Sequence, residues 1–480
     1  MKHKFKLVTL SSLLCANTFA TPLYLPPGQN LTYGSSSNNQ SIMSSVANPA
    51  AAAAQLGRED SQYRFGIFSV GAGYELGDVS DLFDKIDKAA TELKTPISNL
   101  ELQTLASANP TPAGFATAIA DYINNISPTT VSLNKVLSAV EQDGHATVFF
   151  GGYVPLTPFV ISKKGWGGGF VLDANVNVIA NMSVLADPLF ISNATATDIA
   201  AAYLNLLPLP TPPNDSTLLV KAAAVGEIGL GYSRSVLRRE APALLEGESA
   251  PGKLSASELK AGELTAGVRV KYYQVKLAHR AERLTNSSNG SQNTLEADQT
   301  YTANTGVGLD WGALWTSKHY RAGAWINNIN KPSFKYNTIT AAELGTPPYT
   351  NLTIRNQLTK EQTYEMKPQL QLEGAVFSES QNWVVNLGLD ANAVPDPVGR
   401  DFQWMTLSTA YATDSWWIPG VRLGYRSNLA GSKLSYATGG LTLFKALSLD
   451  VAYGLESVKD NKGQSLPRSA MVNLNLQMTF

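Results

Sequence analysis

The chain has little of the chemistry that enzymes and disulfide-rich scaffolds need. Its single cysteine, Cys15, lies close to the amino terminus, and one cysteine cannot form a disulfide within a chain. The four histidines are His3, His145, His279 and His319, and none of them lies at the spacing of a zinc-binding motif. No Gly-x-Ser-x-Gly elbow, Walker loop or dinucleotide-binding glycine motif is present in a suitable setting. We therefore predict no catalytic residue, no metal site and no cofactor.

Charge and long apolar runs are also scarce. Only 16% of the residues are charged, whereas soluble domains have roughly 25%. Lys and Arg number 37 and Asp and Glu 38, so the charge gives no reason to expect contact with nucleic acid. After residue 20, no apolar run approaches the roughly 18 residues of a membrane-spanning helix. If the chain spans a membrane, it does so with strands.

The first residues have the pattern of an export signal. "MKHKFK" is basic, "LVTLSSLLCA" is a short apolar stretch, and "NTFA" offers a cleavage site after the small residue Ala20. We predict that residues 1–20 form a secretory signal peptide. Because Leu14 precedes the cysteine where a small residue would be needed, a lipoprotein anchor is not expected.

Many segments alternate between apolar and polar residues, as strands with one apolar face do. The last segment, "SAMVNLNLQMTF", places Val472, Leu474 and Leu476 on one face and Asn473 and Asn475 on the other. A soluble β-sandwich also alternates. Segments of this length that carry charges on the polar face and end on an aromatic residue are typical of a transmembrane barrel. We predict that Phe480 ends the strand that closes the barrel.

Fourteen strands are expected, an even number as in single-chain bacterial outer-membrane barrels. Going back from the carboxyl terminus, short and long connections alternate, as periplasmic turns and outer loops do. If the short turns are periplasmic, Trp315, Trp383, Trp416, Trp417 and Phe480 lie near one rim and form an aromatic girdle. The alternative is that these Trp are ordinary core residues near turns. The expected strands are residues 63–76, 145–154, 167–185, 217–234, 262–280, 300–315, 319–329, 362–377, 383–392, 401–412, 416–426, 433–445, 447–456 and 468–480.

Three regions are not expected to form the wall. Residues 79–143 have apolar residues at helical spacing, which predicts a helical insert between the first two strands. Residues 187–216 read as a second long outer loop. Residues 236–260 stand where a short turn is expected, so they are either an insertion or a sign that the register there is wrong. The barrel itself is predicted to span residues 61–480.

The segment before the first strand is rich in Pro, Ser and Asn and has little strand signal. We predict that residues 21–60 form a hatch inside the lumen, with a hinge at Asn48, Pro49 and Ala50 because Pro49 restricts its own backbone. The alternative is a disordered periplasmic tail.

Charged residues recur on the polar faces of the expected strands. We predict that they form a charge network in the lumen, although buried carboxylates of this kind could also serve as acid and base in an enzyme. The predicted network comprises Asp173, Arg269, Lys271, Asp310, Asp390, Arg422, Arg426 and Asp450.

Several motifs resemble those of a known family. "SSVANPAAAA" stands just before the expected first strand, "YRFGIFSVGAGYEL". "GLDWGALW" is followed by "YRAGAWINNINKPSF", and "IGLGYSR" is followed by "GELTAGVRVKYYQV". Together with the helical insert, these motifs resemble the TraF-type conjugal-transfer family of outer-membrane barrels, distant relatives of FadL. The resemblance implies a hatch in the lumen and a small, hydrophobic ligand.

These observations predict a porin-like channel or uptake protein in the outer membrane of a Gram-negative bacterium. One alternative is an envelope component of a conjugation or secretion apparatus that transports nothing. The other is an outer-membrane enzyme. The expected partners are outer-membrane lipid and the barrel assembly machinery, together with a small hydrophobic ligand or components of that apparatus.

Overall fold

The structure is a computed structural model of the chain. The residues that it describes are 26–34, 41–55, 62–94, 97–162, 166–212, 214–240, 260–284, 301–339, 358–359, 361–412, 415–460 and 462–479. The predicted signal peptide, Cys15 and Phe480 lie outside these residues.

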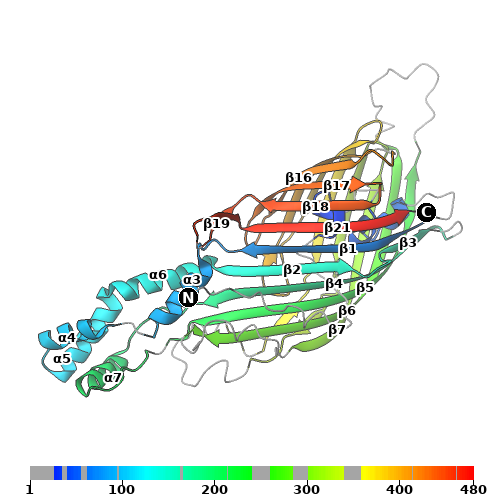
Figure 1. The fold of residues 1–480 in the computed structure, drawn as a ribbon. Coiled ribbons are helices and arrows are strands. Elements are labelled where there is room, and N and C mark those ends of the chain that lie inside the picture. Colours follow the sequence, from blue (N-terminus) through cyan, green and yellow to red (C-terminus); the bar gives the residue numbers. More distant parts are fainter. Residues whose placement is uncertain are drawn as a thin grey trace.

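The strands form one antiparallel barrel (Figure 1). Its first and last strands pair with each other, because Arg64 of β1 lies opposite Thr479 of β21. β2 and β3 share one position between β1 and β4, so the 15 strands of the sheet form a 14-stranded barrel. This confirms the predicted fold class. The strands are β1 (Gln62–Leu76), β2 (His145–Tyr153), β3 (Phe159–Ser162), β4 (Gly168–Leu185), β5 (Thr217–Arg239), β6 (Gly262–Arg283), β7 (Thr302–Thr316), β8 (Tyr320–Asn327), β11 (Gln369–Phe377), β12 (Trp383–Asp390), β15 (Trp404–Tyr411), β16 (Gly420–Asn428), β17 (Ser435–Leu443), β18 (Leu447–Gly454) and β21 (Ser469–Thr479).

The alternation in the sequence decides which side chains face outward. On β18, Leu449 and Val451 are 44% and 42% exposed, whereas Asp450 between them is fully buried. Val472 and Met478 are likewise exposed on β21, while Asn473 and Gln477 are buried. The outside of the barrel is thus apolar and the inside polar, as in barrels that face lipid. Among the described residues, no helix has both the length and the hydropathy to cross a bilayer.

We call the end of the barrel where β21 ends and β1 begins the terminal rim, and the opposite end the helical rim. Trp383, Trp416 and Trp417 lie at the terminal rim and are 54%, 54% and 80% exposed. Trp315 lies near the same rim, at the end of β7. This arrangement agrees with the aromatic girdle inferred from the loop lengths.

The wall is taller on one side. β4, β5 and β6 contain 18, 23 and 22 residues, whereas β12 contains 8. The pairing of β5 with β6 is regular apart from one bulge between Ser235 and Leu237. The register of these strands is therefore sound, and most of the segment from 236 to 260 that broke the loop pattern lies outside the described residues.

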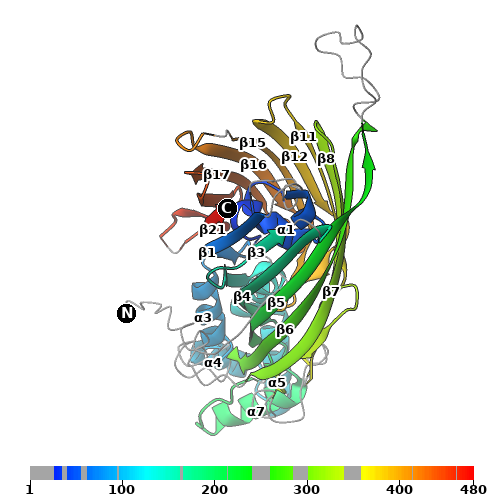
Figure 2. The same ribbon diagram turned by 90° about the vertical axis from the view of Figure 1, so that its right-hand side faces the viewer.

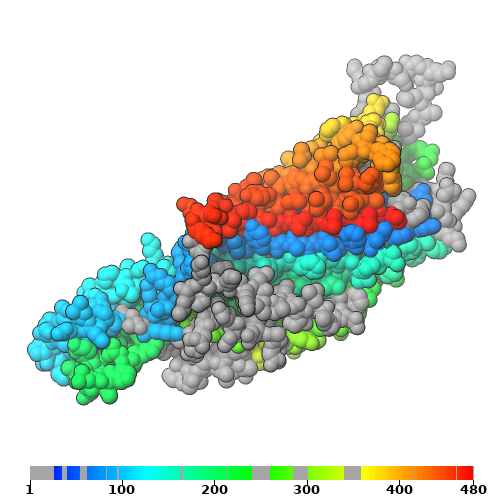
Figure 3. Space-filling model, viewed as in Figure 1, coloured from blue at the N-terminus to red at the C-terminus, as the bar shows by residue number. Residues whose placement is uncertain are grey.

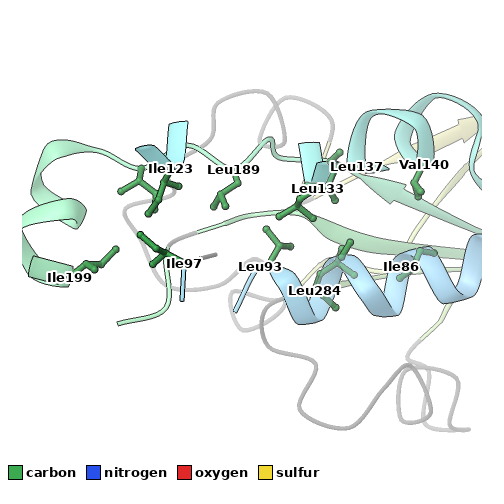
Figure 4. Packing of buried hydrophobic residues seen from close by; sticks show 14 of the residues in the cluster. Ile86, Leu93, Ile97, Ile123, Leu133, Leu137, Val140, Leu189, Ile199 and Leu284 are labelled. Carbon is green, nitrogen blue, oxygen red and sulfur yellow. The ribbon is translucent and has the colours of Figure 1, made fainter. Parts of the chain in front are cut away.

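A group of helices, which we call the helical unit, covers the tall side of the helical rim (Figures 1 and 3). Apolar side chains from these helices pack with Leu189, Leu218 and Leu284 next to the strand ends (Figure 4). The predicted insert is present, but α7 was expected to be loop. α7 was missed because its "ATDIAAAYL" is short and is followed by the Pro-rich stretch "LPLPTPP". The unit comprises α3 (Leu82–Glu92), α4 (Asn99–Ala108), α5 (Pro112–Asp121), η3 (Tyr122–Ile126), α6 (Pro128–Asp143) and α7 (Asn193–Leu204).

The described part of the amino-terminal segment lies inside the ring of strands (Figure 2). It contains η2 (Gly28–Leu31), α1 (Met43–Ala47) and α2 (Ala51–Gln55). Ile42, Met43 and Ala52 are buried against Tyr153, Val160 and Val171 of the wall. We call residues 26–34 and 41–55 the lumenal segment.

Two small hairpins enter the lumen near the helical rim. β9 (Ser333–Lys335) pairs with β10 (Thr363–Glu365), and β13 (Val394–Pro395) pairs with β14 (Asp401–Phe402). The expected strands at 362–377 and 401–412 are therefore each divided. Pro368 lies at the first division, where it cannot donate a ladder hydrogen bond, and Gln403 lies at the second. Phe334, Val394 and Phe402 of these hairpins are buried in the same cluster as Tyr273.

Candidate functional site in the barrel lumen

Five charged side chains form a buried group on the inner wall. Arg269 of β6 donates from Nε to Asp173 Oδ2 at 3.0 Å and also bonds Glu227 of β5. Lys271 Nζ lies 2.7 Å from Asp310 Oδ1 of β7. Each of these side chains is no more than 4% exposed. Paired in this way, the charges avoid the large cost of an isolated ion in the interior.

One of these contacts, from Arg269 on β6 to Asp173 on β4, crosses the strand between them, and a glycine on that strand makes it possible. Asp173 on β4 and Lys271 on β6 both lie opposite Gly229 of β5. A Cβ at Gly229 would lie 2.5 Å from Arg269 Nε and 2.6 Å from Asp173 Oδ2. The side chain of Arg269 therefore crosses β5 where β5 has no side chain of its own.

The same arrangement recurs across the barrel. Arg422 of β16 and Asp450 of β18 both lie opposite Gly440 of β17. The guanidinium donates from Nε and Nη2 to the two carboxylate oxygens of Asp450, at 3.1 and 2.9 Å. This is the bidentate geometry that makes Arg-carboxylate pairs strong.

A third group contains Asp390 and Arg426. Asp390 accepts hydrogen bonds from Gln369, Gln371 and the backbone N–H of Trp404. Arg426 donates to the carbonyl oxygens of Asn30 and Leu31, and its guanidinium lies 4.5 Å from the centre of the Trp404 ring.

The eight residues predicted as one charge network thus occupy three groups on different parts of the inner wall. Glu227 was not included in that prediction. Glu227 could have been found from its sequence, because it alternates with Ile228, Leu230 and Tyr232, which are at least partly exposed, and shares its face with two glycines.

The predicted hinge lies against two other wall glycines. Asn48 donates from Nδ2 to the carbonyl oxygen of Ala313 at 3.3 Å, and its Oδ1 accepts from the backbone N–H of Ala50 at 2.9 Å. A Cβ at Gly312 would overlap Asn48, and one at Gly267 would overlap the Pro49 carbonyl. These glycines belong to "GLDWGALW" and "GELTAGVRVKYYQV", so two of the quoted motifs form the seat of the Asn-Pro-Ala turn. Whether this turn moves as a hinge stays a prediction.

The polar face of β21 holds the lumenal segment in several places. Asn473 donates to the Pro26 carbonyl oxygen at 2.6 Å, and Gln477 accepts from the backbone N–H of Ile42 at 3.0 Å. On β18, Ser448 accepts from the Gln29 side chain at 2.6 Å. The polar residues of the final strand therefore face the lumenal segment, while its apolar residues face outward.

Between the lumenal segment and the hairpins of the helical rim lies a cavity of about 140 Å³. Pro26, Asn30 and Val46 close it from one side, and Val394 and Phe402 from the other. Its wall includes Glu227, Arg269, Lys271, Lys367 and Arg426. Within the described part of the chain, no three His, Cys, Asp or Glu side chains are grouped so as to hold a metal ion.

Comparison with known proteins gave structural likenesses at low sequence identity. The Pseudomonas putida toluene transporter TodX is 13% identical, with 97% of this chain and 99% of that chain covered and a TM-score of 0.33. A FadL homologue from Pseudomonas aeruginosa is 12% identical, with 97% and 99% covered and a TM-score of 0.37. A TodX deletion mutant, a monoaromatic hydrocarbon channel, is 12% identical, with 95% and 99% covered and a TM-score of 0.40. No curated protein matched.

A family profile matches most of the chain. Its description is "F plasmid transfer operon, TraF, protein", and it covers residues 45–244 and 253–390. The matched region begins just before the Asn-Pro-Ala turn and contains the helical unit, the glycine seat of the turn and the strands of the first charge group. The resemblance stated from the sequence is confirmed, and the chain belongs to the TraF family.

Proposed function

We propose that this protein is an outer-membrane channel for small solutes that is closed at rest by its own lumenal segment. The observation that carries the proposal is the cavity between the lumenal segment and the hairpins of the helical rim. A barrel that served only as an anchor would not need a polar cavity bounded by separate pieces of chain.

The way in which the lumenal segment is held supports a removable closure. Beside the apolar contacts of Ile42, Met43 and Ala52, its polar contacts with the wall are single hydrogen bonds, such as Asn473 to Pro26 and Arg426 to Leu31. A typical hydrogen bond contributes only about 0.5–1.5 kcal/mol net. Side chains of the wall can exchange such bonds for bonds to water without loss of the barrel ladder.

The direct test is removal of the segment. A variant that lacks residues 21–45 behind an intact signal peptide should fold into a heat-modifiable barrel and should pass small solutes into liposomes faster than the parent. A deletion variant that folds normally and passes solutes no faster than the parent would contradict the proposal.

The second candidate is a structural component of a conjugation or secretion apparatus. The description of the family supports it, and so does the helical unit, which lies beyond the barrel and leaves Leu100, Ile126 and Val131 exposed. Under this function, the deletion would leave permeability unchanged but would reduce DNA transfer or secretion by the host cell.

A further inference from the structure

We propose that the lumenal cavity binds a small oxyanion, either an inorganic one or the carboxylate of a small organic acid. This inference rests on the channel function proposed above and gives the class of solute. It differs from the small hydrophobic ligand that the family resemblance implied.

The charges that line the cavity carry the inference. Four cationic side chains reach it, from Arg269, Lys271, Lys367 and Arg426, against a single carboxylate, that of Glu227. The other carboxylates of the three groups, Asp173, Asp310, Asp390 and Asp450, are not part of the lining. Asp173 and Asp310 pair with Arg269 and Lys271 and hold them in place, so most of the charged side chains that line the cavity are cationic.

The cations differ in how strongly they are already held. Arg269 and Lys271 pair with carboxylates of the wall, and Arg426 donates to backbone carbonyls. Lys367 lies between β10 and β11, is exposed, and forms no ion pair with the described residues. Its ammonium is therefore the group that can turn to a bound anion at the smallest cost.

Neutral donors on the same surface add to the fit. Asn327, Gln369 and Gln371 line the cavity. Each already donates one amide N–H, to Gln371 or to Asp390, and has a second N–H that can donate to oxyanion oxygens. Charge-assisted bonds of this kind are the strongest available to such a ligand. A volume of about 140 Å³ admits an ion such as phosphate or acetate with a few waters, and it is too small for a long acyl chain.

Isothermal titration of the intact mature protein in detergent with inorganic phosphate, and separately with acetate, tests the inference. We expect saturable binding of at least one of these anions, which Lys367→Gln weakens about tenfold through loss of a charge-assisted bond. The matched control is Lys459→Gln on the exposed hairpin of β19 (Ser457–Lys459), which should bind as the parent does. Tighter phosphate binding would indicate an inorganic ion, and tighter acetate binding an organic acid.

Absence of saturable binding for both anions, or equal binding by Lys367→Gln and the parent, would overturn the inference. These results are independent of the liposome measurement, because the titration uses the closed protein. A closed protein that binds phosphate through Lys367 while the 21–45 deletion passes no solute would keep the anion site and reject the channel.

Discussion

Single side chains decide the inside and the outside of this barrel. At neighbouring positions of β18, Asp450 is fully buried and pairs with Arg422, while Val451 is 42% exposed on the outer face. The two residues are adjacent in sequence, so the same strand meets lipid and a polar lumen within one residue. Substitutions at these two positions can therefore distinguish the outer face from the lumen by their effect on stability.

A cation on the outer face should impair the barrel. Val451→Arg should lower the free energy of unfolding in lipid vesicles by about 2–4 kcal/mol, the range for Arg or Lys near the bilayer midplane. Ser457→Arg, beyond the rim on the exposed hairpin, is the matched control and should change little. Equal urea midpoints for the two variants would mean that Val451 does not face lipid.

Breaking one ion pair should cost more than removing both partners. Arg422→Met leaves the Asp450 carboxylate buried without its guanidinium and should destabilise the barrel by about 3–5 kcal/mol. In the double variant Arg422→Met/Asp450→Leu no charge is left unpaired, so the loss should be smaller. If the double variant is as unstable as the sum of the two single variants, the pair does not act as a unit.

At the level of elements, glycines determine what can cross or approach a strand. Gly229 and Gly440 let an arginine reach over one strand to a carboxylate on the next, and Gly267 and Gly312 let the Asn-Pro-Ala turn touch the wall. The glycines in "IGLGYSR" and "GLDWGALW" are thus explained by side chains and backbone that pack against the inner wall at these positions. Gly388, which also faces the lumen, has no neighbour closer than 4.0 Å to an added Cβ.

This contrast allows a matched test of the seat of the turn. Gly312→Val should push Asn48 and Pro49 from the wall and increase the rate of solute entry into liposomes, with the barrel still folded. Gly388→Val adds the same side chain where there is room and should behave as the parent. Equal flux through both variants would show that the seat does not hold the closure.

The hairpin of β13 and β14 should respond to pH. Burial raises the pKa of Asp396 to about 7, although backbone N–H groups of Arg400 and Val398 donate to its carboxylate. In the unfolded chain the pKa of an Asp carboxyl is about 3.9. Between about pH 4 and pH 7 the carboxyl of Asp396 is therefore protonated in the folded state and ionised in the unfolded state. Stability should therefore fall as the pH rises from about 4 to about 7 and should change no further through this group above that.

Asp396→Asn is the variant for this prediction, because its amide oxygen can still accept from the backbone. The thermal midpoint of the parent should decrease across this pH window by more than that of Asp396→Asn. Parallel curves for the two proteins would mean that the carboxyl group titrates normally in the folded state.

Much of the fold could be predicted from the sequence, because apolar residues recur at every second position wherever one face of a barrel strand is in contact with lipid. The strands of residues 63–76, 383–392 and 447–456 were expected close to their observed bounds. The division of the expected strand at 362–377 was not predicted, because hairpins inside a lumen are held by tertiary contacts, which leave no periodic pattern in the local sequence. The partners within each charge group could not be predicted either. The strand register places Asp173 opposite Gly229, and this register cannot be deduced from the distance between the two residues along the sequence.

For the whole molecule, the described structure is a barrel that is occupied from both ends. The lumenal segment lies toward the terminal rim, the hairpins lie toward the helical rim, and the charged cavity lies between them. The helical unit extends the tall side of the wall (Figure 3). This arrangement is what a gated pore requires, and the central claim is that the lumenal segment is the gate.

A reversible lock on that segment tests the claim most directly. A Cβ at Gly28 would lie 3.5 Å from the Cβ of Asn475 on β21, within the range that a disulfide spans. Gly28 has a φ of +54°, and the backbone strain of a side chain there is shared by the cysteine variant and its serine control. Gly28→Cys/Asn475→Cys can therefore join the lumenal segment to the wall when oxidised, with the corresponding double serine variant as control. Solute flux into liposomes should be lower for the oxidised cysteine variant than for the same variant after reduction, while flux through the serine variant should not depend on the redox state. Equal flux before and after reduction, with the disulfide shown to have formed, would contradict the account.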